Sequence, residues 1–124
     1  MIIITGASGG IGNFLSHELI KGDNVIGTYN KHKPKIKNNK IIFEKVDLLD
    51  SAQIQKFIKK YQKKFKDLKL INCAAHKEDQ LLVNTNLDKW NETINTNLTG
   101  SFLITKEILK LMVKNNFGRI FFLS

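Results

Sequence analysis

The chain has 124 residues, of which 42% are hydrophobic, with a single cysteine and a formal net charge of +9 at pH 7. This length suits one domain with one core, and a lone cysteine excludes both an internal disulfide and a metal site built from several thiolates. No apolar run approaches the roughly 20 residues that span a bilayer, and the N-terminal MIIITG lacks the charged start of a signal peptide, so we expect a cytoplasmic protein with no membrane partner.

The positive charge comes almost entirely from lysine, because Arg119 is the only arginine. Nucleic-acid readers rely on arginine forks and on stacking aromatic side chains, and neither accompanies these lysines. In residues 59–66, KKYQKKFK, the apolar positions continue a helical stripe that starts at Ile54, which leaves the lysines on the solvated face. We therefore expect no nucleic-acid partner; the alternative, a basic nucleic-acid binder, predicts affinity that falls steeply with salt.

Apolar runs and helical stripes alternate along the chain. Strands are predicted at 2–5 (IIIT), 24–29 (NVIGTY), 41–46 (IIFEKV), 68–75 (LKLINCAA, with its exit) and 118–123 (GRIFFL). Helices are predicted along the stripe Ile11, Phe14, Leu15 and Leu19, from a cap at Asp50 or Ser51 through Phe65, at 87–94 and at 98–114, with loops at 31–40 and 76–85. This order predicts an α/β fold, a Rossmann-type doubly wound parallel sheet in the order 3-2-1-4-5, over one domain spanning 1–124.

The segment TGASGGIG, Thr5 to Gly12, joins the first predicted strand to the first helix. A dinucleotide pyrophosphate needs backbone amides that it can approach closely, at the N-terminus of a helix whose N–H groups face the anion. Gly6, Gly10 and Gly12 supply both, although the same glycines could serve only the conformation of the turn. Their spacing is neither the common G-x-G-x-x-G nor a P-loop.

Five segments in this order resemble the short-chain dehydrogenase/reductase family: TGASGGIG, VDL at 46–48, INCAA at 71–75, NTNLTGSF at 95–102 and the final GRIFFLS. The resemblance covers the whole chain. It implies an NAD(P)-dependent oxidoreductase that moves hydride between the cofactor and a small carbonyl or alcohol. NLTGSF resembles the classical branch, whereas Gly6, Gly9 and Gly12 also fit the extended branch, which acts on nucleotide sugars. A non-catalytic dinucleotide-binding module is a further alternative.

The resemblance assigns roles residue by residue. Asp47, with Leu48, matches the acidic position that meets the adenine amino group. Asn72 and Ala74 match the first and third residues of N-N-A-G, which stabilises the sheet beside the cofactor, and Asn97 matches the asparagine that holds a water in the proton relay. The predicted cofactor-binding residues are Thr5, Gly6, Ser8, Gly10, Ile11, Gly12, Asn30, Lys31, Asp47, Leu48, Asn72 and Ala74, with Asn97 catalytic and no metal ligands.

Several of these residues also have plain structural interpretations. Asp47 could be a turn residue at the end of a strand, and Asn97 one asparagine among many. Cys73 and Ala75 depart from the second and fourth positions of N-N-A-G, which affects the local loop geometry. As a lone cysteine in an apolar strand, Cys73 is predicted to be a small core residue and not a reactive thiol.

The segment YNKHK has the Tyr-to-Lys spacing that the family uses on one helix face for proton transfer. Tyr29 ends a predicted strand, however, and Pro34 biases Lys33 away from helical angles. We predict that this segment influences which cofactor binds, because a basic residue after the second strand favours a ribose 2′-phosphate. Asn30 and Lys31, with no acid beside them, favour NADP over NAD; the alternative is a merely solvated lysine loop.

GRIFFLS resembles the fifth strand of the family, whose catalytic serine stands one position beyond Ser124 and whose Tyr-Lys helix follows later. Taking Ser124 itself as that serine is the less favoured alternative. We therefore expect an N-terminal portion, incomplete at the C-terminus and inactive alone, with an apolar strand at the sheet edge. The helix at 98–114 carries more apolar surface than one sheet face covers, and its family counterpart packs at a subunit interface, which predicts a homo-oligomer or self-association.

Overall fold

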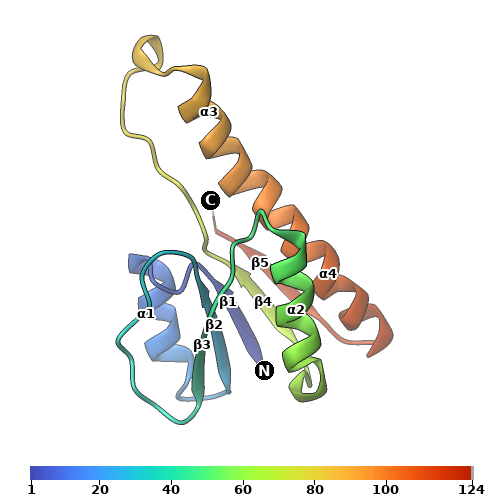
Figure 1. Ribbon diagram of the computed structural model, residues 1–124. Coiled ribbons are helices and arrows are strands. Elements are labelled where there is room, and N and C mark those ends of the chain that lie inside the picture. The colour runs from blue at the N-terminus through green and yellow to red at the C-terminus, as the bar shows by residue number, and fades with distance from the viewer. Residues whose placement is uncertain (124) are drawn as a thin grey trace.

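The computed structural model describes residues 1–123 and contains a five-stranded parallel sheet. Its strands are β1 (Ile2–Thr5), β2 (Val25–Tyr29), β3 (Ile41–Lys45), β4 (Lys69–Asn72) and β5 (Arg119–Phe122). They lie in the order β3-β2-β1-β4-β5, and every neighbouring pair is parallel, which confirms the predicted sheet. Figure 1 shows one helix, α1, on one face and the helices α2 and α4 on the other.

The helices are α1 (Gly10–Leu19), α2 (Ser51–Tyr61), α3 (Leu87–Ile94) and α4 (Ser101–Lys114), with single 3-10 turns at Gln62–Lys64 and Leu82–Asn84. The carboxylate of Asp50 caps α2, where it accepts hydrogen bonds from the backbone N–H groups of Gln53 and Ala52. These bonds lower the pKa of Asp50. The cap predicted at 50 or 51 is therefore confirmed at Asp50.

The sequence predicted two separate helices at 87–94 and 98–114, but in the structure α3 and α4 are continuous. The π-helical segment η3 (Asn95–Gly100) joins them, and the residues at both junctions keep right-handed helical angles. The predicted start of a helix at 98 therefore falls inside a continuous helical rod. In Figure 1 this rod crosses the sheet along α4 and carries α3 beyond the sheet edge.

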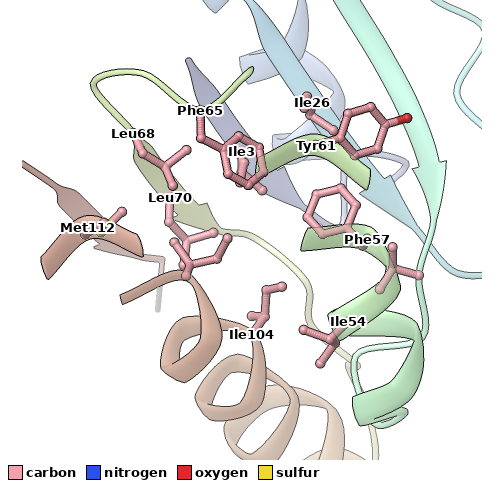
Figure 2. Close-up of a cluster of buried hydrophobic side chains, with 12 residues drawn as sticks. Ile3, Ile26, Ile54, Phe57, Tyr61, Phe65, Leu68, Leu70, Ile104 and Met112 are labelled. Atoms are coloured by element: carbon pink, nitrogen blue, oxygen red, sulfur yellow. The ribbon is translucent and has the colours of Figure 1, made fainter. Parts of the chain in front are cut away.

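The core lies mainly between the sheet and the α2–α4 layer, as Figure 2 shows. The buried side chains of this cluster are Ile3, Ile26, Val46, Ile54, Phe57, Tyr61, Phe65, Leu68, Leu70, Ile104, Ile108 and Met112. Ile54, Phe57 and Tyr61 of α2 belong to this set and Ile58 packs against it, while Lys59, Lys60, Lys63 and Lys64 are exposed. The solvated lysine face expected for α2 is therefore present. A smaller cluster under α1 contains Ile2, Ile4, Ala7, Val25 and Ile41.

The prediction that α1 buries an apolar stripe is wrong in part. Ile11 and Phe14 are each 63% exposed, whereas Gly12 and Ser16 are buried. A Cβ atom at Gly12 would collide with the carbonyl oxygen of Gly6, so the helix lies close against the preceding turn through its small residues. The two leucines of the stripe do pack against the smaller cluster.

The connection from β2 to β3 contains no helix. Parallel strands are usually joined through a crossover helix, yet here an irregular segment at 30–40 makes the whole crossing. No helix within residues 1–123 is both long and apolar enough to cross a bilayer.

Candidate functional site

A cleft of about 440 Å³ opens at the carboxyl ends of β1, β2, β3 and β4. The strand order reverses at β1, whose neighbours are β2 on one side and β4 on the other. Ligands of open α/β sheets bind at this kind of switch point. Seven predicted site residues line the cleft, namely Gly6, Ser8, Asn30, Lys31, Asp47, Leu48 and Ala74.

The turn between β1 and α1 depends on glycine at two positions. Gly6 has a φ of +64°, and a Cβ atom there would lie 2.6 Å from the Cα of Ala74. The carbonyl oxygen of Gly6 also accepts a hydrogen bond from the N–H of Gly9 at 3.0 Å, which closes the turn. Since Gly12 packs on the same carbonyl, the loop folds tightly between β4 and the start of α1.

The first turn of α1 leaves backbone donors free. Its N-cap, Gly9, makes no side-chain capping bond, and within residues 1–123 the N–H groups of Gly10, Ile11 and Gly12 have no acceptor. A Cβ atom added at Gly10 would meet no other atom within 4 Å. Unpaired amides at a helix N-terminus, with open space before them, are suited to a phosphate group. The residues present therefore fit a dinucleotide pyrophosphate.

Thr5 and Asn72 lie beneath the cleft and support its wall. The buried hydroxyl of Thr5 accepts hydrogen bonds from the N–H groups of Cys73 at 3.1 Å and Ala74 at 3.2 Å, so it joins β1 to the exit of β4. Asn72 is 4% exposed and donates through Nδ2 to the hydroxyl of Thr105 on α4 at 3.2 Å. Its Oδ1 atom is buried without a partner within the described residues.

Asp47 takes part in a turn and also lines the cleft. Its Oδ1 accepts a hydrogen bond from the N–H of Leu49 at 2.9 Å, and its own N–H donates to the side chain of Gln53 at 3.0 Å. The two interpretations of Asp47 are therefore compatible. Its neighbour Leu48 packs closely on Gly100, because a Cβ atom added at Gly100 would lie 3.2 Å from the Cβ of Leu48. The sequence did not predict this contact.

Asn97 lies outside the cleft, in the π-helical segment. Its Oδ1 accepts a hydrogen bond from the backbone N–H of His76 at 2.6 Å, and its Nδ2 donates to the carbonyl of the same residue at 3.0 Å. The side chain therefore holds the loop that follows β4. Asn97 lines the groove between α4 and β5, whereas the preceding residue, Thr96, lines the cleft.

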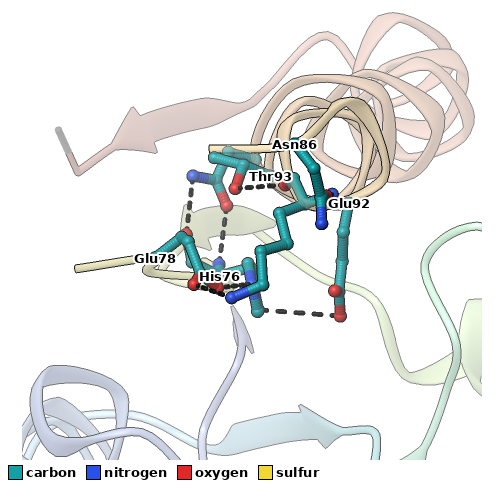
Figure 3. Close-up of polar contacts among 7 residues, drawn as sticks. His76, Glu78, Asn86, Glu92 and Thr93 are labelled. Carbon is teal, nitrogen blue, oxygen red and sulfur yellow. Dashed lines mark hydrogen bonds and ion pairs between the residues drawn. The ribbon is translucent and has the colours of Figure 1, made fainter. Parts of the chain in front are cut away.

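The imidazole of His76 lies between the side chains of Glu78 and Glu92, as Figure 3 shows, and within the described residues its buried Nε2 has no hydrogen-bond partner. Its Nδ1 lies 3.8 Å from a carboxylate oxygen of Glu92, and its Nε2 lies 3.6 Å from Glu78. Lys89 of α3 donates to Glu78 at 2.6 Å, and this hydrogen bond is the main reason that the pKa of Glu78 is lowered. These contacts fasten the loop after β4 to α3 across the mouth of the cleft.

Cys73 is half-buried immediately after β4 and lines the cleft. Burial raises the pKa of its thiol, so the thiol stays protonated near neutral pH. The predicted core position is wrong in part, because Cys73 packs against the smaller cluster but follows β4 and lines the cleft; its lack of reactivity stays a prediction.

The cleft also contains residues that the sequence analysis did not select. They are Gly9, Thr28, Tyr29, His32, Val46, Leu49, Cys73, Ala75, His76, Glu92 and Thr96. Position at the carboxyl end of a strand was a usable signal for Tyr29, Val46 and Ala75, since ligands gather there. Glu92 and Thr96 had no such signal, because they reach the cleft only through the path of the rod.

Two further observations bound the site. Among residues 1–123, no three histidine, cysteine or acidic side chains gather closely enough to hold a metal ion. A larger groove, about 840 Å³, lies between α4 and β5, but its lining is mostly apolar and includes no residue of the glycine turn. The predicted residues Gly10, Ile11 and Gly12 do not line the cleft themselves but follow directly after Gly9, which does. We therefore place the candidate site in the smaller cleft. Ser124 lies outside the described residues.

Sequence comparisons show what the chain is similar to. The family model for short chain dehydrogenase matches residues 1–124. A 3-oxoacyl-[acyl-carrier-protein] reductase of Buchnera aphidicola subsp. Baizongia pistaciae is 35% identical over 127 residues, covering 95% of this chain and 51% of the relative. Its counterpart from subsp. Acyrthosiphon pisum is 37% identical over 128 residues, covering 94% and 51%. The chain thus spans about half the length of these relatives.

Solved structures agree with the fold. ElxO with NADP bound has a TM-score of 0.88 and 32% identity, covering 99% of this chain and 54% of the other. A short chain dehydrogenase from Leptospira borgpetersenii with bound NAD+ has a TM-score of 0.89 and 25% identity, covering 98% and 49%. With the family model matched from end to end, and the glycine turn, parallel sheet and cleft in place, the chain belongs to the short-chain dehydrogenase family.

Proposed function

We propose that this chain is the cofactor-binding portion of an NAD(P)-dependent oxidoreductase that acts on small carbonyl or alcohol substrates and prefers NADP. The observation that carries the proposal is the set of three N–H groups at the start of α1 that have no acceptor within residues 1–123, directly after Gly9 of the cleft and with open space beside Gly10. The relatives named as reductases, and the similar structures solved with NADP or NAD+, support the same class.

The described residues suggest how a dinucleotide would be held. The amides of Gly10, Ile11 and Gly12 would donate to its pyrophosphate, where the helix dipole also favours negative charge. Asp47 would accept from the adenine amino group, and Ala74 forms the opposite wall. When bound, the dinucleotide supplies or accepts the hydride.

Lys31 is the basis for the proposed preference for NADP. It is exposed at the mouth of the cleft beside Asn30, directly after β2. No acidic residue occurs between Asp23 and Glu44, so the segment after β2 offers a ribose 2′-phosphate a lysine and no carboxylate. A Lys31→Asp variant should lose about tenfold of its NADPH affinity relative to NADH, as expected for the loss of one charged contact. Equal ratios before and after the change would contradict the preference.

We further propose that residues 1–124 bind the cofactor without turning it over. Tyr29 and Tyr61 are the only tyrosines. The phenol of Tyr61 donates to Glu44 at 2.6 Å away from the cleft, and Lys33, four residues after Tyr29, is exposed on an irregular segment. Lys60 and Lys64 lie over the ring of Tyr61, but none of these three residues lines the cleft. Within the described residues the cleft therefore lacks a tyrosine and a lysine paired on one helix, so proton transfer coupled to hydride transfer should stay at background. Asn97 is proposed to act only when a complete proton relay is present.

Self-association through the rod is the remaining part of the proposal. Leu98, Phe102 and Val113 are 66%, 58% and 69% exposed, respectively, which leaves an apolar surface suited to a second copy. Light scattering across a concentration series should show mass rising above that of one chain. A single monomeric mass at all concentrations would oppose this part without affecting the cofactor site.

A pair of glycine variants tests the cofactor site directly. Gly10→Ala places a methyl group where the structure has open space, so the fold should be retained while the phosphate is kept away from the amides. Loss of one charge-assisted hydrogen bond, roughly 1.5–3 kcal/mol, should weaken NADPH binding by about tenfold to a hundredfold. Gly22→Ala is the matched control, because its added Cβ also meets nothing within 4 Å but lies beyond the far end of α1. Equal affinities for both variants, measured by NADPH fluorescence, would sink the proposed site.

A further inference from the structure

The crossing from β2 to β3 leaves backbone groups unpaired. Because an irregular segment replaces the usual crossover helix, its residues have no internal helical hydrogen bonds. At its end, Lys40 accepts from the N–H of Val25 at 2.8 Å and Asn38 from that of Ile41 at 3.4 Å. For residues 33–37 the described part of the chain offers no backbone partner. This segment is therefore free to pair with another chain.

The side chains of the segment alternate between inside and outside. Pro34 and Ile36 are half-buried, and Ile36 packs against the smaller core cluster. Lys33, Lys35 and Lys37 are exposed, and none of them lies within 4 Å of a carboxylate of residues 1–123. Because burial alternates along residues 33–37, these three lysines share the solvent-exposed side of the segment, and we call them the lysine row.

A hollow of about 360 Å³ lies next to this row of lysines. It is bounded by Asn13 and His17 of α1, by Ile20 at the C-terminal cap of that helix, and by residues 35–38. Ile20 and Ile36 give it an apolar part, while the lysines stand at its rim. The hollow is separate from the cofactor cleft, which reaches the segment only at Asn30, Lys31 and His32.

We infer that residues 33–37, with the adjoining hollow, form a docking site for an extended acidic segment of a partner protein. The partner's carboxylates would face the lysine row, its backbone would pair with the free groups of the segment, and one apolar side chain would enter the hollow. Addition of a strand to unpaired backbone is a common mode of peptide recognition, and complementary charge supplies its specificity.

A protein partner fits these residues better than a nucleic acid does. Segment 30–42 contains no arginine and no phenylalanine, tyrosine or tryptophan, so it lacks both the fork that reads phosphates and bases and the ring on which bases stack. The inference goes beyond the proposed function, because the site can be occupied while the cleft holds its cofactor.

The test uses the 124-residue chain and a fluorescent eight-residue peptide that alternates glutamate and valine. The triple variant Lys33→Glu, Lys35→Glu, Lys37→Glu should bind it at least about tenfold more weakly. The control Lys59→Glu, Lys63→Glu, Lys66→Glu changes the net charge equally on another exposed surface and should stay within about twofold. Circular dichroism confirms the fold of both, and a Lys35→Gln, Lys37→Gln variant repeats the test without reversing charge.

Two further probes separate the possible explanations. A peptide methylated on alternate backbone nitrogens should bind weakly, since strand pairing needs those donors. Saturating NADPH should leave peptide affinity unchanged. The inference is overturned if the control variant loses as much affinity as the triple variant, if methylation has no effect, or if a twelve-nucleotide oligothymidine binds more tightly than the peptide.

Discussion

The centre of the sheet and its β5 edge differ in how completely their apolar residues are covered. Strand β1 has a neighbour on each side and helices on both faces, and Ile3 and Ile4 are fully buried. Within residues 1–123 strand β5 has a neighbour only in β4. Its Phe121 and Phe122 are 52% and 61% exposed, and Phe122 lines the groove along α4. A run of apolar residues thus indicates that a segment is suited to burial, but the neighbouring elements decide whether burial is achieved.

The largest expected difference is in stability. Phe57→Ala removes a side chain that is 2% exposed in the main core and should lower the free energy of unfolding by about 3–5 kcal/mol. Phe122→Ala, at the open end, should change it by no more than about 0.5 kcal/mol, as is usual for surface positions. Urea denaturation of both variants makes the comparison. Similar losses would mean that the β5 end is packed as tightly as the centre.

A substitution in the glycine turn should have the next largest effect. Gly6→Ala forces a side chain into the left-handed region, at about 1–2 kcal/mol, and against the backbone of Ala74, at about 1–3 kcal/mol more. Thermal unfolding should show the sum, and NADPH binding should fall with it. Gly22→Ala is again the control and should leave both quantities unchanged.

Acid should destabilise the β1–β3 end through two carboxylates. Burial raises the pKa of Glu44, but the hydrogen bonds from Lys60 and Tyr61 outweigh it, so the pKa lies below 4.5. Asp23 is similar: burial raises its pKa, while the bonds from the Met1 amino group and Lys69 bring it below 3.8.

A carboxylate whose pKa is lowered in the folded state contributes stability above its unfolded value and loses it as the pH falls through the folded value. Stability should therefore be level above about pH 5 and decline from about pH 4.5 downward. Urea denaturation at several pH values measures this, and Glu44→Gln should make the decline shallower. A decline that begins near pH 6 would point to histidine instead.

The smallest expected effect concerns the loop after β4. Asn97→Ala removes two hydrogen bonds to His76, worth about 1–2 kcal/mol together. Hydrogen exchange should accelerate in residues 76–86 and stay unchanged at the buried Ile104 of α4. Equal acceleration at both places would show that Asn97 supports the whole fold and not this loop.

The sequence predicted most of what depends on local pattern. The strand order, the Asp50 cap and the glycine turn follow from apolar runs, capping chemistry and glycine spacing. The buried face of α1 was misjudged, because close approach to Gly6 selects small residues there instead of large apolar ones.

Features that depend on distant residues were not predictable. The pairing of Asn97 with His76 joins positions 21 residues apart, and it needs the π-helical segment between α3 and α4, which no local pattern announces. The free backbone of segment 33–37 was likewise hidden, since a lysine-rich sequence indicates only a solvated loop.

The central claim is that the carboxyl edge around β1, and not the groove at α4, binds a dinucleotide. The most direct test is an NMR titration of the isotope-labelled chain with NADPH, following each backbone amide. The account predicts large shifts at Gly10, Ile11 and Gly12, with smaller ones at Lys31 and Asp47, and little change along the groove. Shifts confined to groove residues such as Phe102 and Leu109, or no shifts at saturating NADPH, would contradict it.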